Sequence, residues 1–530
     1  MNFACKDTQF SSNLFIFVSE ISSDFHKINV QHENFSIHQQ KSSFRPFSFR
    51  KQQSFSFNKL FVFFLCTLFS FHFTVVRSQT AVDVKNRLQV NEGWGVSLCW
   101  WANMVGKWQN EEKLDSIVDF LCSPQHLNYN IFRYNIGGGD DPQWRNCDPH
   151  HFGKPREGKG LRAEMPGFKD SQDDEYHWDR DEAQRRVMLK IRERRPDAIF
   201  EAFSNSAPYY LTVSGCVGGA KKATDDNVPP KYYDEFAHYL VDVCRHYKER
   251  YGLEFRTLDP FNEPETNYWH ANGSQEGCHF SPKSQIQFLH VLAPILAESG
   301  LNTRISASDE TSVAQSIEDF RAYQKDGAAL DCVFQWNTHT YKADNALRNE
   351  LRKLVRGTGK HFWMSETGDG GRGIHGNLMM AQRLIDDIRY LQPDAWVDWQ
   401  YIEEFGDQWS LIRSDWNHEQ YTIVKNYYVR YHFTHYIRQG YTYINTDNPH
   451  LLCAISPDES ELVFVCINTE IQQKRSETVD VSSFTTSPSV SSVLTTRRDN
   501  LAANSSFNVA SGAISFDLPP LSIATFIVKK

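Results

Sequence analysis

The chain lacks the excess of positive charge that nucleic-acid-binding proteins use. Its 530 residues contain 56 Lys and Arg against 65 Asp and Glu, which gives a formal net charge of −9 at pH 7. Binding to duplexes depends on Lys and Arg side chains that neutralise phosphates. The composition therefore argues against a nucleic-acid partner. Internal repeats, coiled-coil heptads and Pro-rich tracts are also missing from the sequence, so a repetitive structural protein is disfavoured.

Cysteine motifs for zinc or redox chemistry are missing as well. The sequence has 11 Cys, of which Cys5 and Cys66 precede residue 79, and the other nine are scattered without a CxxC pair. This spacing argues against zinc-ribbon and thioredoxin-like sites. If the chain is in an oxidising compartment, some of the nine cysteines should form disulfides, and because nine is odd at least one thiol would stay unpaired. No set of His, Asp and Glu has metal-ligand spacing in the sequence, so we expect no metal.

The first 78 residues differ from the rest and are predicted to be a leader. They contain an uncharged apolar run of 17 residues, Leu60–Val76, which follows Lys59. Val76-Arg77-Ser78 offers a cleavage site after Ser78, as in secretory signals. The alternatives are an uncleaved membrane anchor through 60–76, since the run is at the short limit for a spanning helix, and a buried helix. A signal would place residues 79–530 outside the cell, in the cell wall, where the Asn272 and Asn504 sequons could carry glycans.

Eight short apolar segments alternate with helical segments between residues 93 and 437. These predicted strands cover 93–101, 130–138, 198–208, 255–264, 304–310, 332–341, 361–368 and 395–405. Alternating strands and helices indicate an α/β fold with a parallel sheet, and eight is the number that closes a (β/α)8 TIM barrel. One intervening helix is expected to start at a capping box, Asp179-x-x-Glu182.

The pattern changes after residue 437. Helical periodicity disappears, and short strand-like runs separated by Ser, Thr, Asn, Asp and Pro continue to the end of the chain. Such runs predict an attached all-β sandwich domain over 438–530. Residues 79–92 precede the barrel without a helix partner, so we expect them to add an N-terminal strand to this sandwich. The catalytic barrel then spans 93–437.

Two glutamates follow predicted strands of the barrel. Glu263, in FNEP, ends the fourth strand, and Glu366, in WMSETG, ends the seventh. Catalytic residues of barrel enzymes lie at the carboxyl ends of strands. Two carboxylates facing one cleft are what glycoside hydrolysis needs, one as proton donor and the other as nucleophile or base. The alternative, a simple turn at Asn-Glu-Pro, is weakened by the second motif at the correct spacing.

Several neighbouring side chains are candidates for binding substrate. Asn262 could donate to a sugar hydroxyl, and Arg133, at another strand end, could hold a nucleophile ionised or make a structural ion pair. The triple glycine 137–139 lacks phosphate-loop spacing and would let Asp140 reach substrate. His339 could equally be a structural histidine or a contact to substrate. Aromatic residues on the same edge could pack on sugar rings or fill the core; the candidates are Trp94, Trp269, Tyr341 and Trp399.

Five segments taken together resemble the endo-β-1,6-galactanase branch of glycoside hydrolase family 30. They are GWGVSLCWWA, FRYNIGGGD, SNSAPYYLTVSG with Asn205, FNEP with the following NYW and QEGC, and WMSETG. The resemblance spans about residues 80–530. It implies a barrel with an attached sandwich and a retaining mechanism without metal or organic cofactor. It also implies that Glu263 is the acid/base, that Glu366 is the nucleophile, and that Arg133, Asn262, Tyr341 and Trp399 line the subsite at the cleaved bond.

The expected substrate is a polysaccharide, the β-1,6-galactan side chains of arabinogalactan, and no protein partner is needed. The nearest alternatives are other specificities of the same family: β-1,6-glucanase, glucosylceramidase or xylanase. A catalytically inactive carbohydrate-binding barrel is a further alternative, although both carboxylates are present. A structural wall protein would require repeats or Pro-rich tracts that the sequence does not contain.

Overall fold

The computed structural model describes residues 78–530, apart from 144, 147–164, 272 and 405–407. The predicted leader up to residue 77, with its apolar run 60–76, lies outside the described residues, and so does the sequon residue Asn272. Among the helices of the described part, none is both long enough and apolar enough to cross a membrane.

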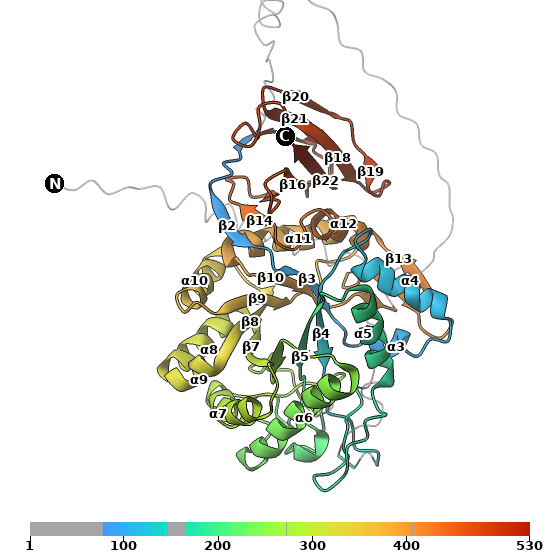
Figure 1. Cartoon of the computed structure of the whole chain (residues 1–530), viewed down its shortest axis with the longest axis vertical. Coiled ribbons are helices and arrows are strands. Elements are labelled where there is room, and N and C mark those ends of the chain that lie inside the picture. Colours follow the sequence, from blue (N-terminus) through green and yellow to red (C-terminus); the bar gives the residue numbers. More distant parts are fainter. Residues whose placement is uncertain (1–77, 144, 147–164, 272, 405–407) are drawn as a thin grey trace, which may run out of the picture. The chain divides into compact units, whose positions relative to one another are not determined.

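Eight parallel strands close into a barrel at the centre of the helices in Figure 1. The strands are β3 (Gly93–Ser97), β4 (Ile131–Asn135), β5 (Ile199–Phe203), β6 (Thr257–Asp259), β7 (Arg304–Ser312), β8 (Val333–Lys342), β9 (His361–Glu366) and β10 (Ala395–Asp398). The barrel closes where β10 pairs with β3, with Trp396 beside Trp94. Each strand falls within or beside one of the eight predicted segments, and the predicted (β/α)8 fold is confirmed.

Helices follow the strands and cover the barrel. They are α3 (Trp101–Val105), α4 (Glu111–Cys122), α5 (Glu182–Arg194), α6 (Tyr233–Tyr251), α7 (Pro282–Glu298), α8 (Val313–Lys325), α9 (Gly327–Cys332), α10 (Asn345–Arg356), α11 (Gly373–Asp386) and α12 (Lys425–Thr434), with shorter turns at Tyr209–Leu211, Pro230–Tyr232 and Asp387–Leu391. Buried residues of α6 recur at helical spacing and include Phe236, Leu240 and Val243. This apolar face, packed on the barrel, is what stabilises the helix.

The predicted capping box at the start of α5 is wrong. The residue before this helix is Asp181, which has a left-handed backbone with φ of 58°, and its side chain makes no cap. One Asp181 oxygen instead accepts hydrogen bonds from the Tyr134 hydroxyl at 2.6 Å and the Gln184 amide at 2.9 Å. The helix therefore begins after Asp181 and not after the predicted cap Asp179, and the Asp181 carboxylate serves a buried tyrosine instead of the helix end.

The remaining strands form an all-β sandwich around its own core of Ile, Val, Leu and Phe. One sheet has the order β1-β17-β21-β20 and the other β19-β18-β22-β16-β15-β14-β2. Their bounds are β1 (Ser78–Ala81), β2 (Arg87–Val90), β14 (Thr442–Ile444), β15 (Leu451–Ile455), β16 (Glu461–Asn468), β17 (Arg475–Asp480), β18 (Ser489–Thr495), β19 (Ala502–Ala503), β20 (Phe507–Ala510), β21 (Ala513–Leu518) and β22 (Ser522–Lys529). A further small sheet consists of β11 (Ile402–Glu403), β12 (Ile412–Asp415) and β13 (Gln420–Ile423).

The segment before the barrel contributes to both sheets of the sandwich. Strand β1 pairs in parallel with β17, and β2 pairs antiparallel with β14. Helix α12 contacts the sandwich through the buried ring of His432. Its Nδ1 lies 2.7 Å from Thr525 Oγ1, and its Nε2 lies 2.9 Å from Thr495 Oγ1. The barrel helices and the sandwich are thus joined by hydrogen bonds as well as by the chain.

Candidate active site

The fourth and seventh barrel strands bring Glu263 and Glu366 together. Glu366 is the last residue of β9, and Glu263 lies in the turn after β6 with a left-handed backbone, φ 49°. Its amide donates a hydrogen bond of 2.9 Å to Asp309 O, which fixes this turn against β7. One carboxylate oxygen of each glutamate and one ring nitrogen of His339 all lie within 4.8 Å of one another. A left-handed non-glycine residue is backbone strain of the kind that gathers at functional sites.

His339 lies beneath the two carboxylates. It is fully buried, with Nδ1 3.2 Å from Glu263 Oε1 and 3.6 Å from Glu366 Oε1, and Nε2 3.1 Å from Asp309 Oδ1. Burial opposes protonation, but the carboxylates of Glu366 and Asp309 outweigh it and raise the pKa of His339 to about 10. The ring therefore acts as a fixed positive charge. Since it is sealed from solvent, His339 positions the glutamates and does not contact substrate directly.

Glu366 is held by one hydroxyl and one guanidinium. The Tyr341 hydroxyl donates to Oε1 at 2.8 Å, and Arg133 Nη1 lies 3.7 Å from Oε2. Among the described residues, Oε2 has no hydrogen-bond partner. Burial raises the pKa of Glu366 to about 7 against the opposing charge of His339, and the neighbouring Glu263 carboxylate adds to the rise.

Arg133 connects the site to the barrel interior. Its Nε donates to Glu201 at 2.8 Å and its Nη2 to Asp309 at 2.6 Å, and all three side chains are fully buried. Burial opposes ionisation of Asp309, but Arg133 and His339 outweigh it and hold the pKa of Asp309 well below its ordinary value. Arg133 is thus both the structural ion pair and the cation near Glu366 that the sequence suggests, but it is covered and cannot line a subsite.

A pocket of about 200 Å³ opens over the two glutamates. It is lined by Asn262, Glu263, Tyr268, Gln275, Thr311, Tyr341, Glu366, Trp399 and Trp409. Of the predicted substrate-binding residues, Asn262, Tyr341 and Trp399 line it. Tyr268 also lines it and donates a hydrogen bond to Glu263 Oε2, although the sequence pattern does not predict it as a site residue. Its place five residues after Glu263, in a turn rich in aromatics, was the available signal.

Besides Arg133 and His339, four other predicted contacts are not among the residues that line this pocket. Trp94 does not contact substrate as predicted, because it is only 1% exposed, packs against Trp396 and donates to Ile437 O at 2.6 Å. It therefore belongs to the core. Trp269 is also buried and donates to Glu263 O at 2.9 Å, so it supports the turn from behind. Asn205 is buried, with Nδ2 donating to Asn135 Oδ1 at 3.1 Å. Asp140 follows β4 and is not among the lining residues.

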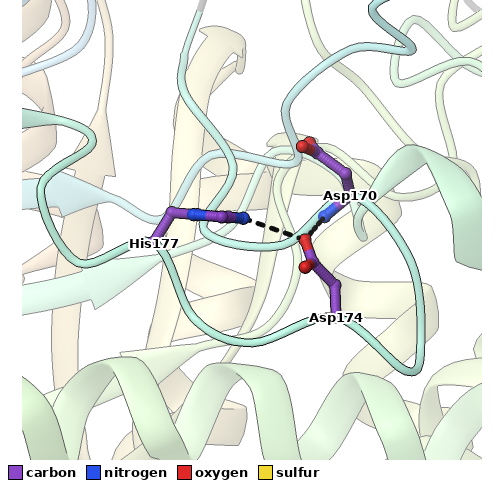
Figure 2. A group of neighbouring side chains, drawn as sticks. All are labelled: Asp170, Asp174 and His177. Carbon is purple, nitrogen blue, oxygen red and sulfur yellow. Dashed lines mark hydrogen bonds and ion pairs between the residues drawn. The ribbon is translucent and has the colours of Figure 1, made fainter.

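In the described part of the chain, His, Asp and Glu side chains gather in three places with atoms within 4.8 Å. One is the glutamate pair with His339. Another joins Asp170, Asp174 and His177 in a loop, as Figure 2 shows. There Asp174 Oδ2 accepts from the Asp170 amide at 3.0 Å and pairs with His177 at 3.1 Å, while Arg180 forms two hydrogen bonds to Asp170. These side chains already satisfy one another and hold the loop.

Comparisons with known proteins agree with this site. The model of O-glycosyl hydrolase family 30 matches residues 77–362, more than half of the chain. The chain belongs to glycoside hydrolase family 30. This glycoside hydrolase is 30% identical over 391 residues to an endo-beta-1,6-galactanase from Hypocrea rufa, a match that covers 71% of this chain and 78% of that protein.

Two more relatives of the family 30 enzyme are informative. An exo-beta-1,6-galactobiohydrolase of Bifidobacterium longum subsp. longum is 24% identical over 414 residues, which are 59% of this chain and 26% of that protein. A solved structure of a conserved exported protein from Bacteroides fragilis has a TM-score of 0.71 and 20% identity, and the alignment covers 85% of this chain and all of that one. The second likeness supports the fold alone.

The glycosidase chemistry of the family requires an acid that protonates the leaving oxygen and a second carboxylate. Glu263 and Glu366 are the two carboxylates in the pocket lining. Asn262 lies beside them with its buried Oδ1 lacking a hydrogen-bond partner among the described residues. Such an oxygen can accept a hydrogen bond from a sugar hydroxyl. The family 30 enzyme therefore has, in one pocket, two carboxylates, an amide with a spare acceptor, and the flat rings of Trp399 and Trp409.

Proposed function

We propose that the protein is a retaining endo-β-1,6-galactanase that cleaves the β-1,6-galactan side chains of arabinogalactan. The observation that carries the retaining mechanism is the approach of Glu263 and Glu366, because one carboxylate oxygen of each lies within 4.8 Å of an oxygen of the other. Retaining glycosidases hold their two carboxyl groups about 5–5.5 Å apart, whereas inverting enzymes leave about 6.5–9.5 Å for a water molecule. The short separation favours direct attack by one carboxylate.

In this proposal Glu366 is the nucleophile. Tyr341 fixes its Oε1, and Oε2 is left without a hydrogen bond among the described residues, as an attacking oxygen requires. Arg133, 3.7 Å from Oε2, favours the anionic state. Attack on the anomeric carbon forms a galactosyl-enzyme and breaks the bond to the leaving oxygen.

Glu263 is the acid/base of the same proposal. Burial raises the pKa of Glu366 in the presence of the Glu263 carboxylate, so the pair holds one proton under mildly acidic conditions. We assign this proton to Glu263 in the substrate complex, because Arg133 approaches only Glu366 of the two. Glu263 then protonates the leaving oxygen and afterwards deprotonates the water that releases the sugar from Glu366.

The choice of galactan rests on the relatives. The Hypocrea rufa protein is named an endo-beta-1,6-galactanase and the Bifidobacterium protein an exo-beta-1,6-galactobiohydrolase. Product analysis on de-arabinosylated β-1,6-galactan, beside β-1,6-glucan and glucuronoxylan, tests this choice. We expect a ladder of galacto-oligosaccharides from the first polymer alone, with the β-anomer appearing first by NMR. Release of galactobiose without longer products would replace endo with exo action, and release only from glucan or xylan would overturn the substrate.

The proposal includes secretion to the cell wall through the predicted signal 60–76. Galactan side chains are extracellular polymers, so an enzyme that acts on them has to leave the cell. Expression of the full chain with a C-terminal tag tests this, because a cleaved signal gives a secreted protein that begins at Gln79. A product that stays in the membrane fraction at full length would support the alternative, an anchor through 60–76.

A further inference from the structure

A second carboxylate cluster lies directly behind the turn that holds Glu263. It consists of Glu265 in that turn, Glu310 on β7 and Asp319 on α8, with one oxygen from each side chain within 4.8 Å of the others. Glu310 and Asp319 are completely buried, and Glu265 is half-buried. Positions 265, 310 and 319 follow no ligand spacing in the sequence, and only the packing of α8 on β7 brings them together.

Several oxygen atoms in this cluster lack partners. Both carboxylate oxygens of Asp319, Oε2 of Glu310 and Oγ of Ser308 are buried without a hydrogen-bond partner among the described residues. Gln285 lies near Asp319; its Nε2 donates to Phe280 O and its Oε1 accepts from the Tyr323 hydroxyl, which leaves a single amide N–H on the side of Asp319. Buried oxygen atoms without partners are costly and call for a bound group.

The arrangement of the partnered atoms shows where such a group would sit. Glu310 Oε1 accepts a hydrogen bond from the Glu265 amide at 3.1 Å, which leaves Oε2 on the side of Asp319. Gln315 of α8 donates to the Glu265 carbonyl at 3.0 Å and holds the turn close to the helix. The buried oxygen atoms without partners belong to Glu310, Asp319 and the Ser308 hydroxyl, and the half-buried Glu265 carboxylate lies at the exposed edge, where an ion could enter.

We propose that Glu265, Glu310 and Asp319, with the Ser308 hydroxyl, bind a divalent cation of the calcium type. Carboxylate and hydroxyl oxygens are the donors that hard cations prefer. Calcium tolerates irregular ligand sets at 2.3–2.6 Å, so ligands on opposite sides of the ion are separated by about twice that distance, which agrees with atoms gathered within 4.8 Å. A divalent ion here offsets two of the three negative charges that the ionised cluster carries.

This cation would link the turn that carries Glu263 to β7 and α8. Glu265 is two residues beyond Glu263, and the Glu263 amide donates to the carbonyl of Asp309, the residue between Ser308 and Glu310. The site is distinct from the glycosidase pocket, because none of its ligands is among the residues that line that pocket. The inference therefore stands independently of the choice of galactan as substrate.

Metal analysis and calorimetry of the full chain test the proposal directly. After dialysis against a chelator at pH 7.5, we expect titration with calcium chloride to bind about one ion per chain. Saturating calcium should raise the midpoint of thermal unfolding by about 3 °C for a chain of this length at a hundredfold excess over Kd. No heat of binding together with an unchanged melting temperature would overturn the proposal, and would mean that the carboxyl groups share protons instead.

Matched variants locate the ion. Glu265→Gln changes the half-exposed ligand and should fold, and we expect it to weaken calcium binding at least tenfold and to remove most of the thermal shift. Asp319→Asn should do the same where it folds. The control is Asp174→Asn, which alters the acidic loop cluster of Figure 2 and should leave the calcium response unchanged. A response lost in the control and kept in Glu265→Gln would place the ion elsewhere and contradict the proposal.

Discussion

The hydroxyl of Tyr341 donates a hydrogen bond of 2.8 Å to Oε1 of Glu366. Tyr341 lies on β8 and Glu366 ends the neighbouring strand β9, so the contact is set by the parallel pairing of the two strands. It orients the carboxylate so that Oε2 is left without a hydrogen bond among the described residues. A residue on one barrel strand thus prepares the reactive atom at the end of the next.

Tyr341→Phe removes this hydrogen bond and keeps the ring. We expect kcat to fall on the order of 10²-fold, as for the loss of one preorganised donor at a reacting group, while KM changes little. Steady-state kinetics on galactan measure both constants. Tyr323→Phe, at a buried tyrosine that donates to Gln285 away from the pocket, is the control. Equal losses in the two variants would indicate a general effect on folding.

Glu366→Gln and Glu263→Gln should fail in different ways. Glu366→Gln removes the attacking oxygen, so we expect a loss of about 10⁴-fold or more with every substrate and an unchanged melting curve. Glu263→Gln removes the proton donor, which matters less when the leaving group is a good one. With a nitrophenyl β-galactoside as substrate, the Glu263→Gln variant should therefore still form the galactosyl-enzyme, whereas the Glu366→Gln variant should not. Activity of Glu366→Gln within tenfold of wild type would refute the assignment of the nucleophile.

The fold and the glutamate pair could be predicted from the sequence because both depend on local patterns. Eight apolar runs mark the strands, and a carboxylate at the end of a barrel strand must face the mouth of the barrel. Side-chain partners across the barrel could not be predicted in the same way. Trp94 and Trp269 have the same residue type as Trp399, and only packing decides which ring faces the pocket.

Buried polar contacts between distant residues account for the other differences. Asp181 accepts a hydrogen bond from Tyr134 and does not cap the helix, and burial at the end of the barrel strand raises the pKa of Glu366. The roles of His339 and Tyr268 likewise depend on which carboxylate each reaches in space. Sequence spacing contains no information on these contacts.

Hydrolysis should decline as the pH rises through about 7. Burial raises the pKa of Glu366 to about 7 beside Glu263, so the pair holds one proton below that pH and loses it above. A glycosidase with both carboxylates ionised lacks its acid. The alkaline limb of the kcat/KM profile should therefore lie near pH 7, with an optimum on the acid side. A profile that still rises between pH 7 and 9 would contradict a shared proton.

Arg133→Met tests the buried ion pairs beneath the site. The change leaves Glu201 and Asp309 without their cation in a fully buried position, and breaking such a pair typically costs about 3–5 kcal/mol. Denaturant unfolding measures the loss. Arg321→Met is the matched control, since its ion pair with Glu350 is exposed at the surface and should be worth less than about 1 kcal/mol. Similar losses of unfolding free energy in both variants would show that the buried ion pairs of Arg133 stabilise the fold no more than an exposed ion pair does.

Tyr268→Phe tests the hydroxyl that donates to Glu263. This hydrogen bond stabilises the ionised carboxylate, and its loss makes the pair hold its shared proton to higher pH. We therefore expect the alkaline limb of kcat/KM to move upward by about half a unit to one unit. Removal of the sugar from Glu366, which needs Glu263 as a base, should slow as well. A burst of leaving group before steady state, absent in wild type, would reveal this change.

Thr311→Val alters a pocket neighbour 3.4 Å from the same hydroxyl and serves as control, because it keeps the donor to Glu263. A limb that stays in place in Tyr268→Phe, or moves to lower pH, would mean that the hydroxyl does not stabilise the ionised form of Glu263.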